Sequence, residues 1–150
     1  MTAASPTPQR PEIHASAQCA CGAVSVAARG TVRSMFLCSC EDCQRATGTG
    51  HAAVLMLRAD DVAVSGPTRA SDTQAQSGAT MTRWTCARCG TPVAAQSSRA
   101  TTLINLPVGL FGAAAAGWFR PSQLLFARSL RAWDQVDPDL PRHATYRESP

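Results

Sequence analysis

Apolar residues recur at every second position in several short stretches of the chain. In residues 23–29, Val24 and Val26 stand two apart, as the inward-facing side chains of a half-buried strand do. Similar short apolar or alternating runs cover residues 35–40, 54–57, 62–64, 81–86 and 101–108, and Gly, Pro, Ser and Asp separate them. The pattern predicts a mostly β fold, a small domain of several short antiparallel sheets.

The ends of the chain lack this pattern. Three prolines interrupt residues 1–17, and the apolar residues there are small, so we expect a disordered N-terminal tail. Residues 18–141 then form the folded domain, and residues 142–150 form a C-terminal tail.

Residues 122–133 fit two interpretations. As a short amphipathic helix they would place Phe126, Leu130 and Trp133 on one face. As a strand followed by a turn they would use the apolar pair at 124–125 instead. The sequence leaves both open.

Composition excludes several classes of protein. The chain has 150 residues, of which 45% are hydrophobic and 16% charged, which suits one domain with its own core. No apolar run approaches the roughly 20 residues that span a bilayer, so we expect no membrane association. The opening MTAASPTPQRPE lacks a basic stretch followed by an apolar one. We therefore expect a cytoplasmic protein.

The charge pattern argues against nucleic acid as a partner. The formal net charge is +4, and all 14 basic residues are arginine, scattered without a basic block. The absence of lysine also excludes chemistry through a lysine Schiff base.

The cysteines carry the strongest functional signal. There are seven, an odd number that suits a disulfide framework poorly: Cys19, Cys21, Cys38, Cys40, Cys43, Cys86 and Cys89. Their Cys-x-Cys and Cys-x-x-Cys spacings let two thiols meet one metal ion across a tight turn.

The spacing favours two zinc ions. The pairs Cys19/Cys21 and Cys86/Cys89 are each followed by glycine, and together they make a closed structural Cys₄ site. The middle group, residues 38–43, supplies three thiols and leaves one position open, as in a catalytic zinc site. Three alternatives remain: an iron–sulfur site that includes the middle thiols, disulfides, or a single metal with redox-active middle cysteines.

Three motifs resemble one known family. The strings CACGAV (19–24), CSCEDCQRATGTG (38–50) and WTCARCGTPV (84–93) resemble, in order and spacing, the glutathione-dependent formaldehyde-activating enzymes, also called the centromere-protein-V family. The likeness covers roughly residues 18–141. Leu124-Leu125-Phe126 and the Ala113–Ala116 run depart from the family pattern, near the segment expected to help line the pocket.

The resemblance implies a zinc-stapled β domain. Cys19, Cys21, Cys86 and Cys89 would hold a structural zinc, and Cys38, Cys40 and Cys43 a second, catalytic zinc. The family activity joins glutathione and formaldehyde into S-hydroxymethylglutathione, the work of a carbon–sulfur lyase. The partners would be a small thiol such as glutathione and a small aldehyde.

Residues close to the middle cysteines are candidates for substrate binding. Arg45 could meet a glutathione carboxylate, and Thr47 and Gly48 could offer donors near the thiolates. Glu41 and Asp42 are the nearest acids in sequence for proton transfer, although a solvated loop pair is the commoner explanation for such residues.

His51 could act as a proton shuttle or a fourth ligand, or be an ordinary histidine at the start of a strand. Trp84 and Trp118 could wall the pocket or simply pack in the core.

Thiols add readily to formaldehyde without a catalyst, so an enzyme need supply little acceleration. A non-catalytic zinc-dependent thiol-binding carrier is therefore an alternative function, and a zinc-stapled interaction module is another.

Overall fold

Ten strands form the framework of the fold in the computed structural model, which describes residues 9–147. The strands are β1 (Glu12–Gln18), β2 (Ser25–Thr31), β3 (Ser34–Cys38), β4 (Ala52–Arg58), β5 (Val62–Ser65), β6 (Thr68–Gln74), β7 (Thr80–Cys86), β8 (Pro92–Ser97), β9 (Leu103–Pro107) and β10 (Leu124–Leu125). One helix, α1 (Glu41–Thr47), and three 3₁₀ segments, η1 (Ala59–Asp61), η2 (Val108–Gly117) and η3 (Ala127–Ser129), connect them.

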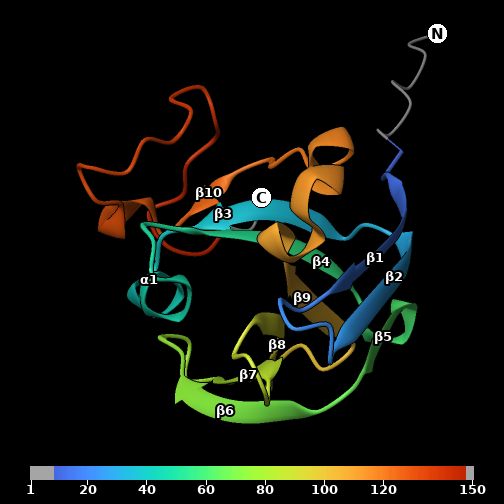
Figure 1. Cartoon of the computed structure of the whole chain (residues 1–150). Helices are drawn as coiled ribbons and strands as arrows, with labels where there is room; N and C mark the ends of the chain where they lie inside the picture. Colours follow the sequence, from blue (N-terminus) through green and yellow to red (C-terminus); the bar gives the residue numbers. More distant parts are fainter. Residues whose placement is uncertain (1–8, 148–150) are drawn as a thin grey trace, which may run out of the picture.

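The strands form two sheets. The smaller has the order β1-β2-β5, and the larger has the order β10-β3-β4-β9-β8-β7-β6 and curls from the top of the molecule to its base (Figure 1). All named strand pairs are antiparallel except β10 with β3. The prediction of a mostly β fold with several short sheets is confirmed. In the described part of the chain, no helix is long and apolar enough to cross a membrane.

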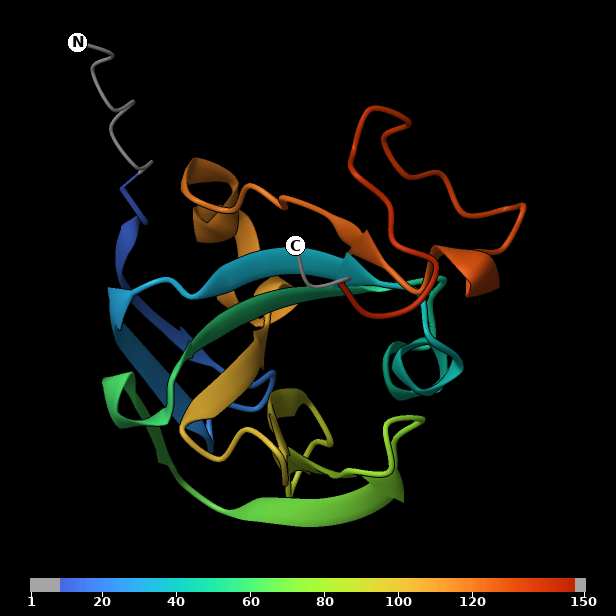
Figure 2. The same cartoon turned by 180° about the vertical axis from the view of Figure 1, so that it is seen from behind.

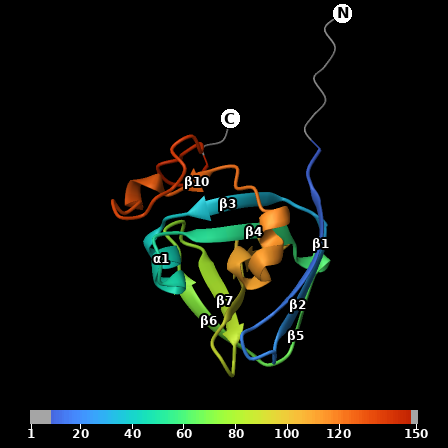
Figure 3. The same cartoon turned by 45° about the horizontal axis from the view of Figure 1, so that its top comes forward.

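The main core lies where the two sheets face each other. Val24, Leu55, Leu57, Val93 and Leu106 are fully enclosed there. The segment η2 packs against β1, β4 and β9 and closes this core from one side (Figure 3). The residues at alternating apolar positions in the sequence therefore form the core between the two sheets.

The N-terminal expectation is wrong for residues 12–17. These residues pair with β2 along its whole length as strand β1, and Ile13 is buried in the main core. Ala15 and Ala17 pack partly against the same core, so small side chains suffice on this face. The remainder of the predicted tail includes residues 1–8, which lie outside the described part.

Residues 122–133 form a strand followed by a turn, and the amphipathic helix is wrong. Leu124 and Leu125 take the free edge of β3, after which Phe126 adopts a left-handed conformation (φ 56°) and leads into η3. Trp133 is 68% exposed and not on a buried helix face.

The C-terminal residues 142–147 are irregular but not a free tail. The backbone N–H of His143 donates to the Leu124 carbonyl, and that of Phe126 donates to the Thr145 carbonyl, each at 3.0 Å. Figure 2 shows this segment folding back over β10 and β3, beside α1. The contact places the end of the chain next to the middle cysteines.

Candidate functional site

The first cysteine cluster ties the two sheets together. Cys19 and Cys21 lie in the turn between β1 and β2, whereas Cys86 ends β7 and Cys89 lies in the turn before β8. The Sγ atoms of Cys19 and Cys21 are 3.6 Å apart, and those of Cys21 and Cys86 are 3.8 Å apart. Four sulfurs placed tetrahedrally at about 2.3 Å from a zinc ion lie about 3.8 Å from one another. The cluster therefore has the dimensions of a Cys₄ zinc site.

Both halves of this cluster are built on the same kind of turn. The Gly22 N–H donates to the Cys19 carbonyl at 3.0 Å, and the Gly90 N–H to the Cys86 carbonyl at 2.9 Å. Both glycines have φ 77°, a conformation that other residues rarely adopt. Backbone N–H groups also point at the sulfurs, as Val24 N does at 3.2 Å from Cys19 Sγ. Such donors stabilise thiolate ligands.

The second cluster lies at the junction of β3 and α1. Cys38 ends the strand, Cys40 caps the helix and Cys43 lies in its first turn, with the three sulfurs within 4.8 Å of one another. The Cys43 N–H donates to Cys40 Sγ at 3.3 Å, which starts the helix. Gly48, in the left-handed conformation (φ 72°), ends it.

The three thiols of the second cluster compete for protons. The neighbouring Cys38 and Cys43 thiols lower the pKa of Cys40 to about 2. The contact with Cys40 in turn raises the pKa of Cys38 far above its ordinary value. One thiolate is thus stabilised at the expense of its neighbours, and only a cation can hold all three ionised. The donor set is that of a soft metal ion.

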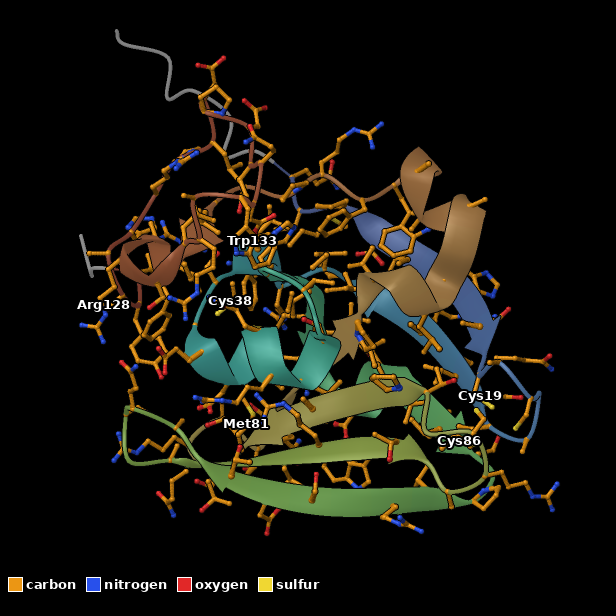
Figure 4. The ribbon with its side chains drawn as sticks, turned by 60° about the vertical axis from the view of Figure 1, so that its left-hand side comes forward. Cys19, Cys38, Met81, Cys86, Arg128 and Trp133 are labelled. Atoms are coloured by element: carbon orange, nitrogen blue, oxygen red, sulfur yellow. The ribbon has the colours of Figure 1, made fainter. Side chains whose placement is uncertain are left out.

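A cavity of about 280 Å³, the thiol pocket, opens beside this cluster. The residues that line it come from β3, α1, the β6–β7 hairpin, β7, the end of β10 and the C-terminal segment: Cys38, Cys40, Glu41, Asp42, Cys43, Arg45, Ala75, Gln76, Met81, Arg83, Phe126 and Tyr146. Figure 4 shows Cys38 and Met81 on either side of α1, whereas Cys19 and Cys86 lie at the opposite side of the molecule. A second hollow, beside β1, β2 and β5, contains no thiol and no charged side chain among its lining residues.

The sequence candidates next to Cys43 divide into two groups. Arg45, Glu41 and Asp42 line the thiol pocket. Thr47 and Gly48 do not: the Thr47 hydroxyl donates to the Cys43 carbonyl at 2.8 Å, and Gly48 caps α1. Their observed contacts thus stabilise the helix that carries Cys43.

His51 belongs to neither cluster, although it precedes Ala52, the strand partner of Cys38. The His51 Nδ1 is 2.7 Å from Asp134 Oδ2. This pair joins the residue before β4 to the loop that follows η3. His51 is not grouped with the three thiols as a metal ligand, and it does not line the thiol pocket. Trp84 and Trp118 pack against the main core, which confirms the core interpretation for both.

Sequence reasoning missed half of the pocket. Arg83 and Met81 reach it from β7, and Tyr146 reaches it from the C-terminal segment. Its ring packs edge to face on that of Phe126, which follows β10, with the centroids 4.7 Å apart. The two-residue spacing of Met81 and Arg83 places them on one face of a strand, a signal that was present in the sequence.

Fold and site together define a small, mostly β protein with two cysteine clusters of metal-binding geometry. The sequence profile of the glutathione-dependent formaldehyde-activating enzymes matches residues 14–129, so the chain belongs to this family. No curated protein matches the chain significantly. A crystal structure of a Rhodobacter sphaeroides protein, a structural genomics target, is similar with a TM-score of 0.52 and 18% identity over 65% of this chain and 88% of that one. At this identity the likeness concerns the fold alone.

Proposed function

We propose that the protein is a zinc-dependent carbon–sulfur lyase that joins glutathione to formaldehyde as S-hydroxymethylglutathione. The observation that carries this proposal is the second cluster, in which three thiols converge at a pocket and none of the described residues supplies a fourth ligand. Membership of the family supports glutathione and formaldehyde as the substrates.

The two clusters have different roles in this proposal. Cys19, Cys21, Cys86 and Cys89 hold a structural zinc with no position for a substrate. Cys38, Cys40 and Cys43 hold the second. When bound there, zinc would lower the pKa of a substrate thiol and so supply a nucleophile at neutral pH.

The other pocket residues shape the space beside the thiols. Phe126 and Tyr146 form an apolar wall, and Met81 faces α1 from β7. In the addition, the substrate sulfur bonds to the formaldehyde carbon, and the thiol proton ends on the former carbonyl oxygen. Glu41 and Asp42 line the pocket and are the groups we assign to move that proton.

Exchange NMR with ¹³C-formaldehyde and glutathione tests the proposal, because it measures interconversion of free and thiol-bound formaldehyde at equilibrium. The wild-type protein is expected to raise the exchange rate above the uncatalysed one, and Cys40→Ser to restore the uncatalysed rate. Ser39→Ala is the matched control, since it changes the same loop, keeps all seven thiols and should retain the acceleration. Glutathione binding without acceleration would contradict the lyase and indicate the carrier instead.

A further inference from the structure

Two arginines line the thiol pocket, and their surroundings differ. Arg45, on α1, has a side chain that is 75% exposed. Its guanidinium lies 3.6 Å from Glu41 and 3.9 Å from Asp42, on the same helix. Its charge is therefore already balanced by carboxylates of this chain.

Arg83 is half-buried and has no such partner. Its Nη1 donates to the Thr73 hydroxyl on β6 at 2.8 Å, and no carboxylate of residues 9–147 lies within ion-pair distance of it. Met81, two residues earlier on β7, lines the same pocket, so both side chains leave the same face of the strand. The Thr73 hydroxyl, a neutral group, thus positions the Arg83 guanidinium beside the pocket.

The Arg83 charge acts to lower the pKa of the Cys43 thiol, but none of the carboxylates that line the pocket pairs with Arg83. Glu41 and Asp42 contact Arg45, and Glu41 is also 3.5 Å from Arg131. Partial removal of an arginine from water costs free energy unless an anion pairs with it. The planar guanidinium accepts a carboxylate in a two-point hydrogen bond, which makes a carboxylate the fitting ligand.

We propose that Arg83 binds a carboxylate of the thiol substrate, so that the pocket selects thiols that carry a carboxylate over thiols that do not. The inference rests on the proposed function, because the sulfur of the same molecule must lie at Cys38, Cys40 and Cys43. Glutathione, with two carboxylates, meets the requirement. Cysteamine, a thiol with no carboxylate, does not.

Calorimetric titration of the zinc-loaded protein with glutathione and with cysteamine tests the inference. Arg83→Met is expected to weaken glutathione binding about 10- to 100-fold, the usual loss for a charge-assisted hydrogen bond. It should not weaken the binding of cysteamine, whose ammonium group Arg83 repels. Arg83→Lys keeps the charge and most of the stem, so it should recover part of the loss. Arg69→Met removes an exposed arginine from the adjacent strand β6 and should change neither titration.

The contradicting results are distinct. If the wild-type protein binds glutathione and Arg83→Met binds it equally well, the role of Arg83 is overturned and the thiol assignment stands. The same holds if Arg45→Met causes the larger loss, because the carboxylate would then lie at α1. If the wild-type protein binds neither thiol, the proposed function and this inference both fail.

Discussion

Replacing Cys86 with serine is expected to unfold the domain, whereas replacing Cys40 is not. Cys86 is only 2% exposed and belongs to the main core together with Cys19. Its cluster joins two turns from different sheets, and its contact with Cys21 spans 65 residues of sequence. Cys40 is less buried and caps a single seven-residue helix beside a small separate group of apolar residues.

The magnitudes of the two losses differ widely. A structural zinc site contributes roughly 10–16 kcal/mol in small zinc-binding peptides. The free energy of unfolding of a whole domain is about 5–15 kcal/mol. Loss of the Cys₄ site therefore removes a free energy as large as the stability of the whole domain. At Cys40 the lost helix cap costs about 1 kcal/mol, equivalent to a Tm decrease of about 2–4 °C in a chain of this size. Loss of the second zinc adds to this cost, but it leaves intact the Cys₄ site that joins the two sheets.

Metal analysis together with thermal unfolding followed by circular dichroism measures both effects. Cys86→Ser should retain at most one zinc. It should already be unfolded at 25 °C and therefore show no cooperative transition on heating. Cys40→Ser should lose the second zinc, keep the Cys₄ zinc and remain folded at 25 °C with a cooperative thermal transition, its Tm within a few degrees of the wild-type protein whose second cluster is empty. A cooperative Cys86→Ser protein, or a Cys40→Ser protein that melts as badly as Cys86→Ser, would refute this division of roles.

Three further substitutions test the packing around the site, each by the free energy of unfolding in denaturant. Gly66→Ala is expected to cost more than 1 kcal/mol, because the new Cβ would lie 2.1 Å from the Ala23 carbonyl oxygen in a backbone with φ 105°; a stability equal to wild type would contradict the turn. Gly50→Ala should cost about 1–3 kcal/mol, since its Cβ would lie 2.3 Å from the Asp134 carboxylate, and Asp134→Ala should remove much of that cost in the double variant. Additive losses would show that the two do not touch. Ser39→Ala should stabilise the protein by up to about 1 kcal/mol, because its hydroxyl is fully buried without a hydrogen-bond partner; a clear loss of stability would reveal one.

The sequence predicts the sheets and both clusters well, for different physical reasons. The strands follow from the alternation of residues such as Val24 and Val26, which one face of a sheet requires. The clusters follow from short-range spacing, because ligands one to three residues apart meet the same ion across a turn. The 4 + 3 division of the cysteines agrees with the geometry of the two groups.

Local patterns fail where the structure depends on distant contacts. Strand β1 directs Ile13 and two alanines toward the core, so its apolar pattern in the sequence is weak. These residues form a strand because they pair with β2. Helix α1 is too short to show a periodic pattern. Its N-cap is a cysteine, Cys40, which in the sequence indicates a metal ligand and not the start of a helix. Phe126 and Tyr146 enter the pocket only because the chain end folds back over β3.

A glutathione titration of the Co²⁺-substituted protein, followed by its visible d–d and sulfur-to-metal absorption bands, asks whether a substrate thiolate binds the metal of the second cluster. We expect a saturable spectral change in the wild-type protein and none in Cys40→Ser, because only the second cluster has room for another thiolate. An unchanged wild-type spectrum at millimolar glutathione, with two metals bound, would contradict the assignment of the thiol pocket to glutathione.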